Sequence, residues 1–504
     1  MIFRKLLKPK VFFIAGLLCV FSASWVFSEP LEVTVESAIL IALENNQSLK
    51  IERLEPQIYT TYEDEEQAVF DPVLSGETSF SSERGQSRKS SSSTSYESEN
   101  TSTEVGIGVS QFLSTGTDIE AELSTDSAWS DLYSDLSASR IGLSVTQALL
   151  RGRGTGVNLA SLRQARLDTQ ISEYELRGFA EALVSQVEET YWDYALAQRN
   201  IQTFQKSLKI AEQQLKETEE LIKVGKLPET EITSAQAEIA LQQQGLINVR
   251  STMAKKRLLL LRLLNPPGSN LWQREILLKY VPGVPKVTLD SVESHVEVAL
   301  RLRPDLNEAR LSVERGDLEV VKTKNGLLPK LDLFVTLGKT GYADSFGSSV
   351  SNITGDYYDF SVGISVQYPF RNRDAKASYK RSLLTLDQAN EAVNNLASLV
   401  EMDVRTAYIE VNRTKEQIFA SKATRKLQEE QLRIETEKFR VGRSTMFLVA
   451  QAQRDLLESQ ISETQAIANH LKAIVELYRL EGSLLERRGI MAPGREPAGG
   501  ITRP

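Results

Sequence analysis

A single uninterrupted helical segment most constrains what this chain can fold into. No proline or glycine occurs between Asn372 and Val441, and apolar residues recur there at steps of three and four. That spacing places them on one face of an α-helix. At about 1.5 Å per residue, roughly 70 residues form a rod on the order of 100 Å long. Such a rod needs other helices alongside it, as in a coiled coil or a bundle.

A glycine-centred turn ends this rod, and the chain contains a second rod of the same kind. Gly442 gives the backbone the freedom to end the helix, and Ser444 is predicted to cap the helix that returns. The second rod covers about residues 155–223, turns at 224–227 and returns as far as about Leu264. The sequence therefore predicts two long helical hairpins.

Two segments between the helices, residues 73–149 and 330–370, alternate apolar and polar residues. Ile141, Leu143 and Val145, for example, alternate with glycine, serine and threonine. This period of two predicts strands with one apolar and one polar face. Both a soluble β-sandwich and a transmembrane barrel would show it.

Loop lengths favour the barrel. Two polar segments, Ser81–Ser102 and Trp129–Ser137, are predicted as long loops at one end of the strands, and Ser114–Thr117 as a tight turn at the end near the helices. Long loops on one side and short turns on the other are typical of outer-membrane barrels. We predict six strands, four from the first segment and two from the second.

The order of elements occurs twice, which indicates a duplication. Val224-Gly225 and Val441-Gly442 lie 217 positions apart, whereas Pro72 and Pro329, upstream of the strands, lie 257 apart. The first half therefore holds 40 more residues (257 minus 217) in its strand region, about the length of two barrel strands with loops.

The first 28 residues are predicted to be a secretory signal peptide, with basic residues before a short apolar run. The single cysteine, Cys19, lies inside it, but Leu18 is not the small residue that a lipoprotein signal has before its cysteine. Cleavage before Glu29 would leave a mature chain without disulfides. No later stretch reaches about 18 apolar residues, so strands would have to cross any membrane.

Charge and motifs argue against nucleic-acid binding and catalysis. The net charge of −8 becomes −12 without the four basic residues of the signal peptide, whereas nucleic-acid-binding surfaces are basic. His295 and His470 lie in different helical segments and predict no metal site. Arg151–Gly156 lacks the glycine and lysine positions of nucleotide loops, and is predicted to be a flexible strand-to-helix corner beside lipid headgroups. We expect no enzyme activity and no cofactor.

Short motifs follow one another along the two halves of the chain: Thr34-Val35-Glu36-Ser37-Ala38, Ala42-Leu43-Glu44-Asn45-Asn46, Arg303-Pro304-Asp305-Leu306, Leu327-Leu328-Pro329-Lys330-Leu331, Arg405-Thr406-Ala407-Tyr408, Lys438-Phe439-Arg440-Val441-Gly442 and Ala450-Gln451-Ala452-Gln453. In this order, and twice over, these motifs resemble those of the TolC-type outer-membrane efflux family. The resemblance covers about Leu31–Leu485, with Gln47 standing where the family usually has proline.

The resemblance implies a homotrimer in the outer membrane of a diderm bacterium, with a long periplasmic part. Three copies would share one barrel of about 18 strands; the alternative is that the extra hairpin of the first half folds outside the barrel wall. It also implies a passive, porin-like export duct of a tripartite efflux or type I secretion system. An inner-membrane pump of RND, ABC or MFS type would drive it through a periplasmic adaptor protein, and outer-membrane lipid would surround it.

The resemblance assigns two candidate sites. The adaptor would dock at the tips, formed by Val224, Gly225, Lys226, Leu227, Val441, Gly442, Arg443 and Ser444. Members of the family narrow the periplasmic entrance with a carboxylate ring, but here Leu448 and Gln451 stand at those positions, and Asp455 would replace the ring in part. The family's tyrosine and arginine gate pair is replaced by Phe439 and Ser444.

The expected fold is mainly α-helical with a β-barrel portion: a coiled-coil helical barrel joined to a transmembrane β-barrel, with two internal repeats in each chain of a trimer. The expected divisions are a signal peptide (1–28), a first repeat (29–264, with short helices 34–69, strands 73–149 and a long hairpin 155–264), a linker (265–287), a second repeat (288–485, with short helices 289–328, strands 330–370 and a long hairpin 372–485) and a disordered tail (486–504).

Two other functions remain open from the sequence. A periplasmic adaptor also has long helical hairpins, but it would lack the strands and the duplication. A structural coiled-coil spacer of the envelope would conduct no ions across a bilayer.

Overall fold

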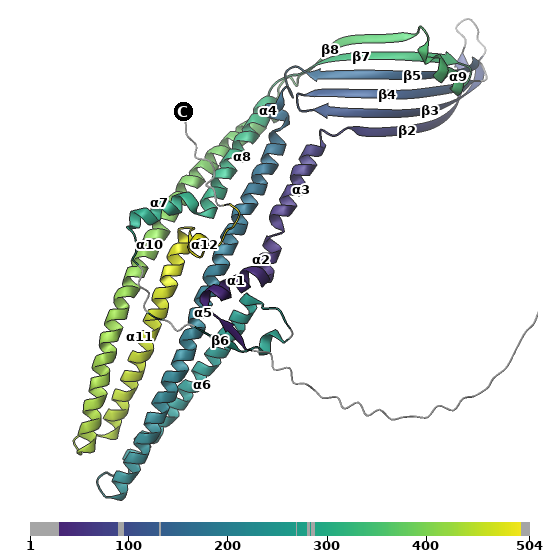
Figure 1. The fold of residues 1–504 in the computed structure, drawn as a ribbon. Helices are drawn as coiled ribbons and strands as arrows, with labels where there is room; N and C mark the ends of the chain where they lie inside the picture. Colours follow the sequence, from purple (N-terminus) through teal and green to yellow (C-terminus); the bar gives the residue numbers. More distant parts are fainter. Residues whose placement is uncertain are drawn as a thin grey trace, which may run out of the picture.

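The computed structural model describes residues 30–88, 95–130, 133–268, 270–279, 283 and 288–494. They form a long helical part with a curved sheet at one end (Figure 1). The predicted signal peptide, with Cys19, and residues 495–504 of the predicted tail lie outside the described residues.

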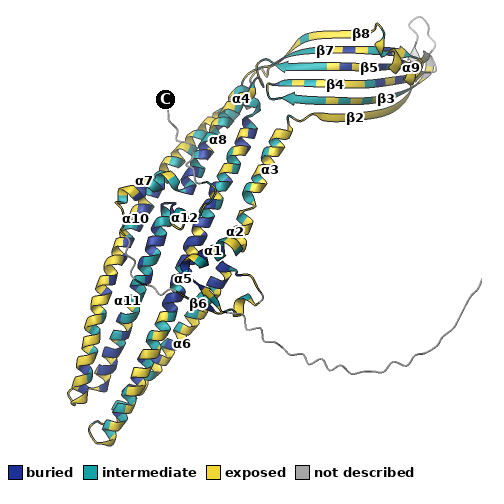
Figure 2. Cartoon of the chain, in the orientation of Figure 1, coloured by how far each residue is buried: buried dark blue, intermediate teal, exposed yellow. Residues whose placement is uncertain are grey.

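Two long hairpins make up most of the helical part. In the first, α5 (Ala160–Lys223) returns as α6 (Glu231–Leu264), and in the second, α10 (Arg373–Arg440) returns as α11 (Met446–Leu480). The 68 residues of α10 extend for about 100 Å. Part of its predicted apolar stripe is buried against α11 and α7 (Val292–Leu302), namely Val400, Val404, Ala407 and Val411. Figure 2 shows such buried positions along the facing sides of the rods.

Shorter helices lie along the rods on the side of the sheet (Figure 1). The first half supplies α1 (Val35–Asn45), α2 (Gln47–Glu52) and α3 (Glu55–Ala68), which contact α5. The second half supplies α7 and α8 (Pro304–Gly326), which contact α10.

Thr34 caps the first short helix, α1. Thr34 Oγ1 accepts a hydrogen bond from the backbone N–H of Ser37 at 3.1 Å, which satisfies one of the free amides of the first turn. Ser291 Oγ accepts the same bond from Ser294 at 3.3 Å in α7. Thr34 and Ser291 lie 257 positions apart, the offset seen upstream of the strands.

Six strands form one antiparallel sheet in the order β2-β3-β4-β5-β7-β8. The first half gives β2 (Val73–Arg88), β3 (Ser95–Leu113), β4 (Thr117–Ser130) and β5 (Tyr133–Ala148), and the second gives β7 (Lys330–Ala343) and β8 (Tyr358–Gln367). The turn Ser114–Gly116 lies at the helical end of the sheet, since Asn158 Nδ2 donates to Ser114 O at 3.1 Å.

The prediction of long loops at Ser81–Ser102 and Trp129–Ser137 is wrong for most of these residues. β2 and β3 pair as far as Arg88 and Ser95, and β4 and β5 pair as far as Ser130 and Tyr133. Strand pairing depends on hydrogen bonds between backbone N–H and C=O groups, so polar side chains do not prevent it. Here they also bond across the strands, as Ser81 Oγ and Ser102 Oγ do at 2.8 Å.

The strand register aligns the alternating residues of all six strands, so that one face of the sheet carries an apolar row and the other a small or polar row. One row crosses all six strands with exposed apolar side chains, in the order Leu74, Val109, Ala121, Leu143, Leu337 and Phe360. The neighbouring row on the opposite face is small or polar: Ser75, Gly108, Glu122, Gly142, Gly338 and Asp359. None of the described helices is long and apolar enough to cross a membrane.

The predicted linker, residues 265–287, contains two short regular elements. Its β6 (Ile276–Leu278) pairs in parallel with β1 (Leu31–Val33), and a 3-10 turn, η1 (Leu271–Gln273), precedes it. The prolines in this linker disfavour a helix. They still allow a three-residue strand, because β6 pairs with the backbone of a single neighbouring strand, β1. The remaining short elements are α4 (Thr155–Asn158), α9 (Phe346–Ser351) and η2 (Asn352–Thr354).

The tail predicted as disordered from Glu486 is ordered as far as Gly494. It follows α12 (Leu484–Arg487), whose leucines lie in the main apolar core with α1, α5 and α6. Arg488 binds the buried carboxylate of Glu188 with two N–O distances of 2.6 and 2.5 Å. Arg177 Nη1 donates to Gly494 O at 3.3 Å. These contacts with α5 order a segment whose composition is typical of disorder.

Candidate functional site

The two turns at the free ends of the hairpins have the same backbone geometry. Gly225 and Gly442 both have φ of +71°. Lys226 N donates to Leu221 O at 2.9 Å, and Arg443 N donates to Lys438 O at 2.8 Å. A glycine in the left-handed region with this bond is a Schellman motif, which satisfies the last carbonyl groups of the helix.

The tips present apolar and basic side chains to solvent. Val224 is 66% exposed and Val441 is 69% exposed, and Lys226 and Arg443 follow the two glycines, also exposed. Leu227, predicted as a tip residue, is instead half-buried in an apolar cluster that joins the two hairpins. The cluster contains Leu215, Leu221, Leu227, Ala235, Leu432, Phe439, Met446 and Val449.

The two tips also share a hydrogen bond. Glu231, at the start of α6, accepts a bond at 2.8 Å from the backbone N–H of Met446, at the start of α11. A carboxylate near a helix N-terminus is favourable because free N–H groups and the positive end of the helix dipole lie there. Phe439, the replacement for a gate tyrosine, is buried in the cluster that surrounds this bond.

The prediction that Ser444 caps α11 is wrong by one residue. Thr445 has the extended backbone of a cap (φ −107°, ψ 157°), and its side chain accepts from Leu448 N at 3.4 Å. Ser444 Oγ instead donates to Glu435 Oε2 at 2.9 Å, and Lys438 Nζ lies 2.8 Å from Glu435 Oε1. Lys438 and Ser444 together hold the pKa of the Glu435 carboxyl below its ordinary value.

The predicted entrance residues share one face of α11. Leu448, Gln451 and Asp455 are three and four residues apart, so they follow one line along the helix, and all three are exposed. Asp455 makes no ion pair with any residue that the structure describes. Glu458, three residues further along the same line, is also exposed and makes no ion pair with a described residue, so this face carries two unpaired carboxylates.

A buried ion pair below the tips was missed from the sequence. Arg454 Nη1 lies 2.8 Å from Glu238 Oε2, and the Glu238 side chain is fully buried. Gln242 Nε2 donates to the other oxygen of Glu238 at 2.6 Å. The repeat gives no signal for this pair, because Asp455, 217 positions after Glu238, is exposed. The same repeat position is a buried structural carboxylate in one hairpin and an exposed one in the other.

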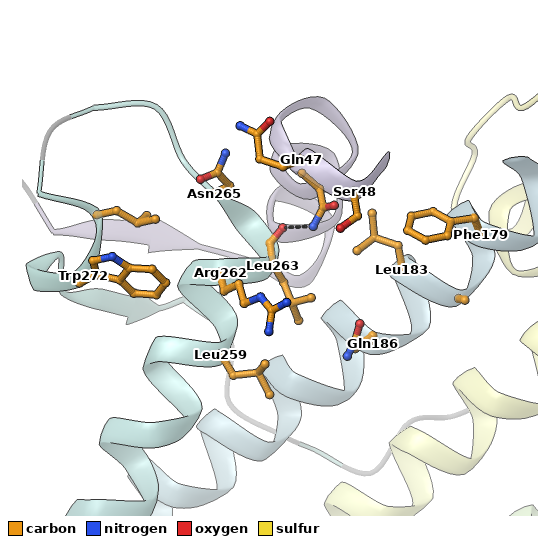
Figure 3. Close-up of a pocket in the computed structure, with 13 residues that line it drawn as sticks. Gln47, Ser48, Phe179, Leu183, Gln186, Leu259, Arg262, Leu263, Asn265 and Trp272 are labelled. Carbon is orange, nitrogen blue, oxygen red and sulfur yellow. Dashed lines mark hydrogen bonds between the residues drawn. The ribbon is translucent and has the colours of Figure 1, made fainter. Parts of the chain in front are cut away.

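A cavity of about 590 Å³ lies beside α5, between the α1–α2 corner, α6 and η1 (Figure 3). Seven apolar and six polar residues line it, among them Gln47, Phe179, Leu183, Gln186, Arg262 and Trp272. In the second half, the positions matching Asn46 and Gln186 are Arg303 and Asp403, which form an ion pair at 2.9 Å. No predicted tip or entrance residue lines the cavity.

Comparisons with known proteins agree with this architecture. The sequence matches the family described as outer membrane efflux protein over residues 38–266 and 296–483. The structure is similar to the outer-membrane channel OprN (TM-score 0.68, 16% identity, 89% of this chain and 90% of that chain). It is also similar to the CmeC outer membrane channel of Campylobacter jejuni (TM-score 0.67, 16% identity, 89% and 86%). The open-state MtrE channel of Neisseria gonorrhoeae gives a TM-score of 0.63 at 17% identity, with 89% of each chain covered. No curated protein matches the sequence.

The family match over both halves, together with a fold shared with solved outer-membrane channels, defines the class as an outer-membrane efflux channel. The chain belongs to the outer membrane efflux protein family, because the family match extends over both halves. The resemblance to the TolC-type family is therefore confirmed.

Proposed function

We propose that this chain is the outer-membrane channel of a tripartite efflux or type I secretion system. The apolar row that crosses all six strands, Leu74 to Phe360, carries the proposal. A sheet face that is apolar from edge to edge and exposed is stable against lipid and unstable in water. The opposite row, which includes Glu122 and Asp359, then faces a water-filled lumen.

The active form in this proposal is a homotrimer with one shared barrel. Among the described strands, β2 and β8 each pair on one side only. Unpaired backbone groups cost several kcal/mol each in hydrocarbon, so these edges require partners there. Three sheets joined edge to edge would close a barrel of about 18 strands. The helices would continue the lumen as a tube through the periplasm.

Matching contacts support two repeats within each chain. Tyr191 Oη donates to Val33 O at 3.4 Å, and Tyr408 Oη donates to Asp290 O at 3.3 Å. The tyrosines lie 217 positions apart, and the carbonyls 257 apart. Together with the identical turns at Gly225 and Gly442, these contacts argue that the two hairpins descend from one unit.

The tips would dock a periplasmic adaptor, which links the channel to an inner-membrane pump. Val224 and Val441 offer apolar contacts, and Lys226 and Arg443 offer charge. The entrance would be the face with Leu448, Gln451 and Asp455. The duct itself carries its cargo passively, so the pump supplies the energy.

Two adjacent substitutions on opposite faces of β5 test the proposal. An arginine on the lipid face near mid-membrane costs about 2–4 kcal/mol, whereas the lumen face tolerates it. Leu143→Arg should therefore lower the amount of trimer in the outer membrane, and Ser144→Arg should leave it unchanged. Purified trimers should produce conductance steps in planar bilayers. Equal effects of the two substitutions, or a trimer that conducts no ions, would refute the proposal and favour an envelope spacer.

A further inference from the structure

Four arginines at the boundary between sheet and helices have no ion-pair or side-chain hydrogen-bond partner among the described residues. Arg151 and Arg153 follow β5, and Arg371 and Arg373 lie between β8 and the start of α10. We refer to these four as the crossing arginines. All are exposed, and none makes a side-chain hydrogen bond or an ion pair with another described residue.

Arginines farther along the sheet behave differently. Arg84 lies 3.1 Å from Glu97, and Arg140 lies 2.6 Å from Asp359. These side chains are neutralised within the chain. Among the arginines whose side chains the structure describes, those without an acidic partner in this part of the chain therefore lie at the end of the sheet that adjoins the helices. Figure 1 shows this end of the sheet.

Backbone contacts bring the two crossings together. Leu149 N donates to Leu331 O at 2.8 Å, and Arg151 N donates to Pro329 O at 3.3 Å. Asn372 Nδ2 donates to Leu327 O at 3.1 Å. Both crossings thus attach to the corner between α8 and β7, although they lie more than 200 residues apart in sequence.

A cleft of about 310 Å³ separates the crossings. Its lining includes Arg151 and Arg373, the hydroxyl residues Thr323 and Ser378, and one carboxylate, Asp374. The formal charge of these lining groups is +1, from two arginines and one aspartate. A singly charged anion matches that balance.

The order of residues along β8 indicates how deep this cleft would lie relative to the membrane. Exposed apolar residues run from Phe360 to Val366, exposed aromatic residues follow at Tyr368 and Phe370, and the crossing arginines come next. Membrane proteins place aromatic side chains at the lipid–water interface, just outside the apolar band. Cations immediately beyond that interface lie at the level of lipid phosphates.

We propose that the crossing arginines bind the phosphodiester of anionic phospholipids in the leaflet nearest the helices, with one headgroup in the cleft between Arg151 and Arg373. The planar guanidinium group matches two phosphate oxygens at once. A phosphodiester carries the single negative charge that the cleft balances. The proposal rests on the proposed function, since only a sheet that spans the membrane puts the cleft at this level.

Side chains, rather than backbone amides, would hold the phosphate. Gly152 N donates to Asn325 Oδ1 at 2.8 Å, and Gly154 N donates to Thr115 O at 3.0 Å. The glycine-rich segment Arg151–Gly156 therefore has two of its amides already occupied. The segment lacks the pattern of a nucleotide-binding loop, and in this proposal an arginine side chain contacts the phosphate instead of the loop amides.

Native mass spectrometry of the full-length trimer tests the proposal. The trimer is incubated with phosphatidylglycerol and phosphatidylethanolamine, and retained lipids are counted. The wild type should retain phosphatidylglycerol preferentially. Arg151→Gln/Arg373→Gln should weaken its binding roughly 30-fold, which corresponds to about 1 kcal/mol for each cation near the surface. The matched control, Lys216→Gln/Arg250→Gln, removes two exposed charges from the rods and should bind like the wild type.

The remaining outcomes separate the alternatives. Equal retention by all three proteins would overturn the proposal, as would displacement of the lipid by excess inorganic phosphate, which would indicate a site for free anions. Conductance of the wild type in bilayers of phosphatidylethanolamine alone reports on the proposed function independently. A wild type that conducts there but shows no lipid preference would refute only the lipid site.

Discussion

Arg454→Met is expected to loosen the two hairpin tips from each other. Arg454 and Gln242 are the donors to the buried Glu238 carboxylate, at 2.8 and 2.6 Å. Without Arg454, a charge that stays out of water keeps a single amide donor. Removing one partner of a buried pair costs about 3–5 kcal/mol. Arg454 is 38% exposed, so water partly reaches the vacated position, and we expect about 3 kcal/mol, the lower end.

Hydrogen exchange measures this loss where it occurs. Amides of α6 and α11 near the tips should exchange roughly 100-fold faster, because exchange follows the free energy of local opening. Amides of the sheet should not change. Arg443→Met, at an exposed arginine without a partner among the described residues, is the control and should stay within about 0.5 kcal/mol.

A second variant tests the cause. Glu238→Gln/Arg454→Met buries an uncharged amide in place of the carboxylate and should recover most of the protection. The reasoning fails if Arg454→Met exchanges like the wild type, or if the double variant is less protected than the single one.

Four further predictions concern separate parts of the molecule. Gly442→Pro and Gly225→Pro forbid the positive φ of +71° and should stop export, measured by drug susceptibility, while trimer levels on gels stay normal; transport that survives both excludes the tips as docking sites. Thr115→Cys should resist an impermeant thiol reagent on intact cells and react once the outer membrane is permeabilised; labelling of intact cells contradicts the topology. Burial raises the pKa of Glu181 to about 8 from 4.5, so the folded state holds a proton that the unfolded state releases. Thermal stability should therefore fall from about pH 5 to about pH 8, and Glu181→Gln should flatten that loss; an unchanged slope refutes it. Trivalent cations on the periplasmic side should block single-channel currents weakly, and strong block that survives Asp455→Asn would contradict this.

Features set by local chemistry could be predicted from the sequence. The helix of α10 follows from its unbroken periodicity, and the turns at Gly225 and Gly442 from the conformation that only glycine adopts easily. The cap at Thr34 is likewise local, because its partner Ser37 lies three residues away. Strand alternation likewise gave the apolar face, since register preserves a period of two.

Features set by distant contacts could not be predicted from the sequence. Ser444 and Thr445 are both good caps, and the choice between them depends on Glu435, which binds Ser444 from the preceding helix. The ordered segment after Glu486 depends on charges in α5, far away in the chain. The sequence predicted the positions of the two tip turns in the candidate site. It did not predict the Glu238–Arg454 ion pair that joins the hairpins.

Contacts between α5 and the segment 481–494 make the folding of α5 depend on residues far along the chain. Glu188 and Arg177 are nearly inaccessible to water, and their partners Arg488 and Glu486 lie 300 and 309 residues further along. Until these counter-ions are in place, burying the charges of α5 alone would cost several kcal/mol per ion. A variant truncated before this segment would therefore stay open to proteases. These contacts would act as a length check on a newly made chain.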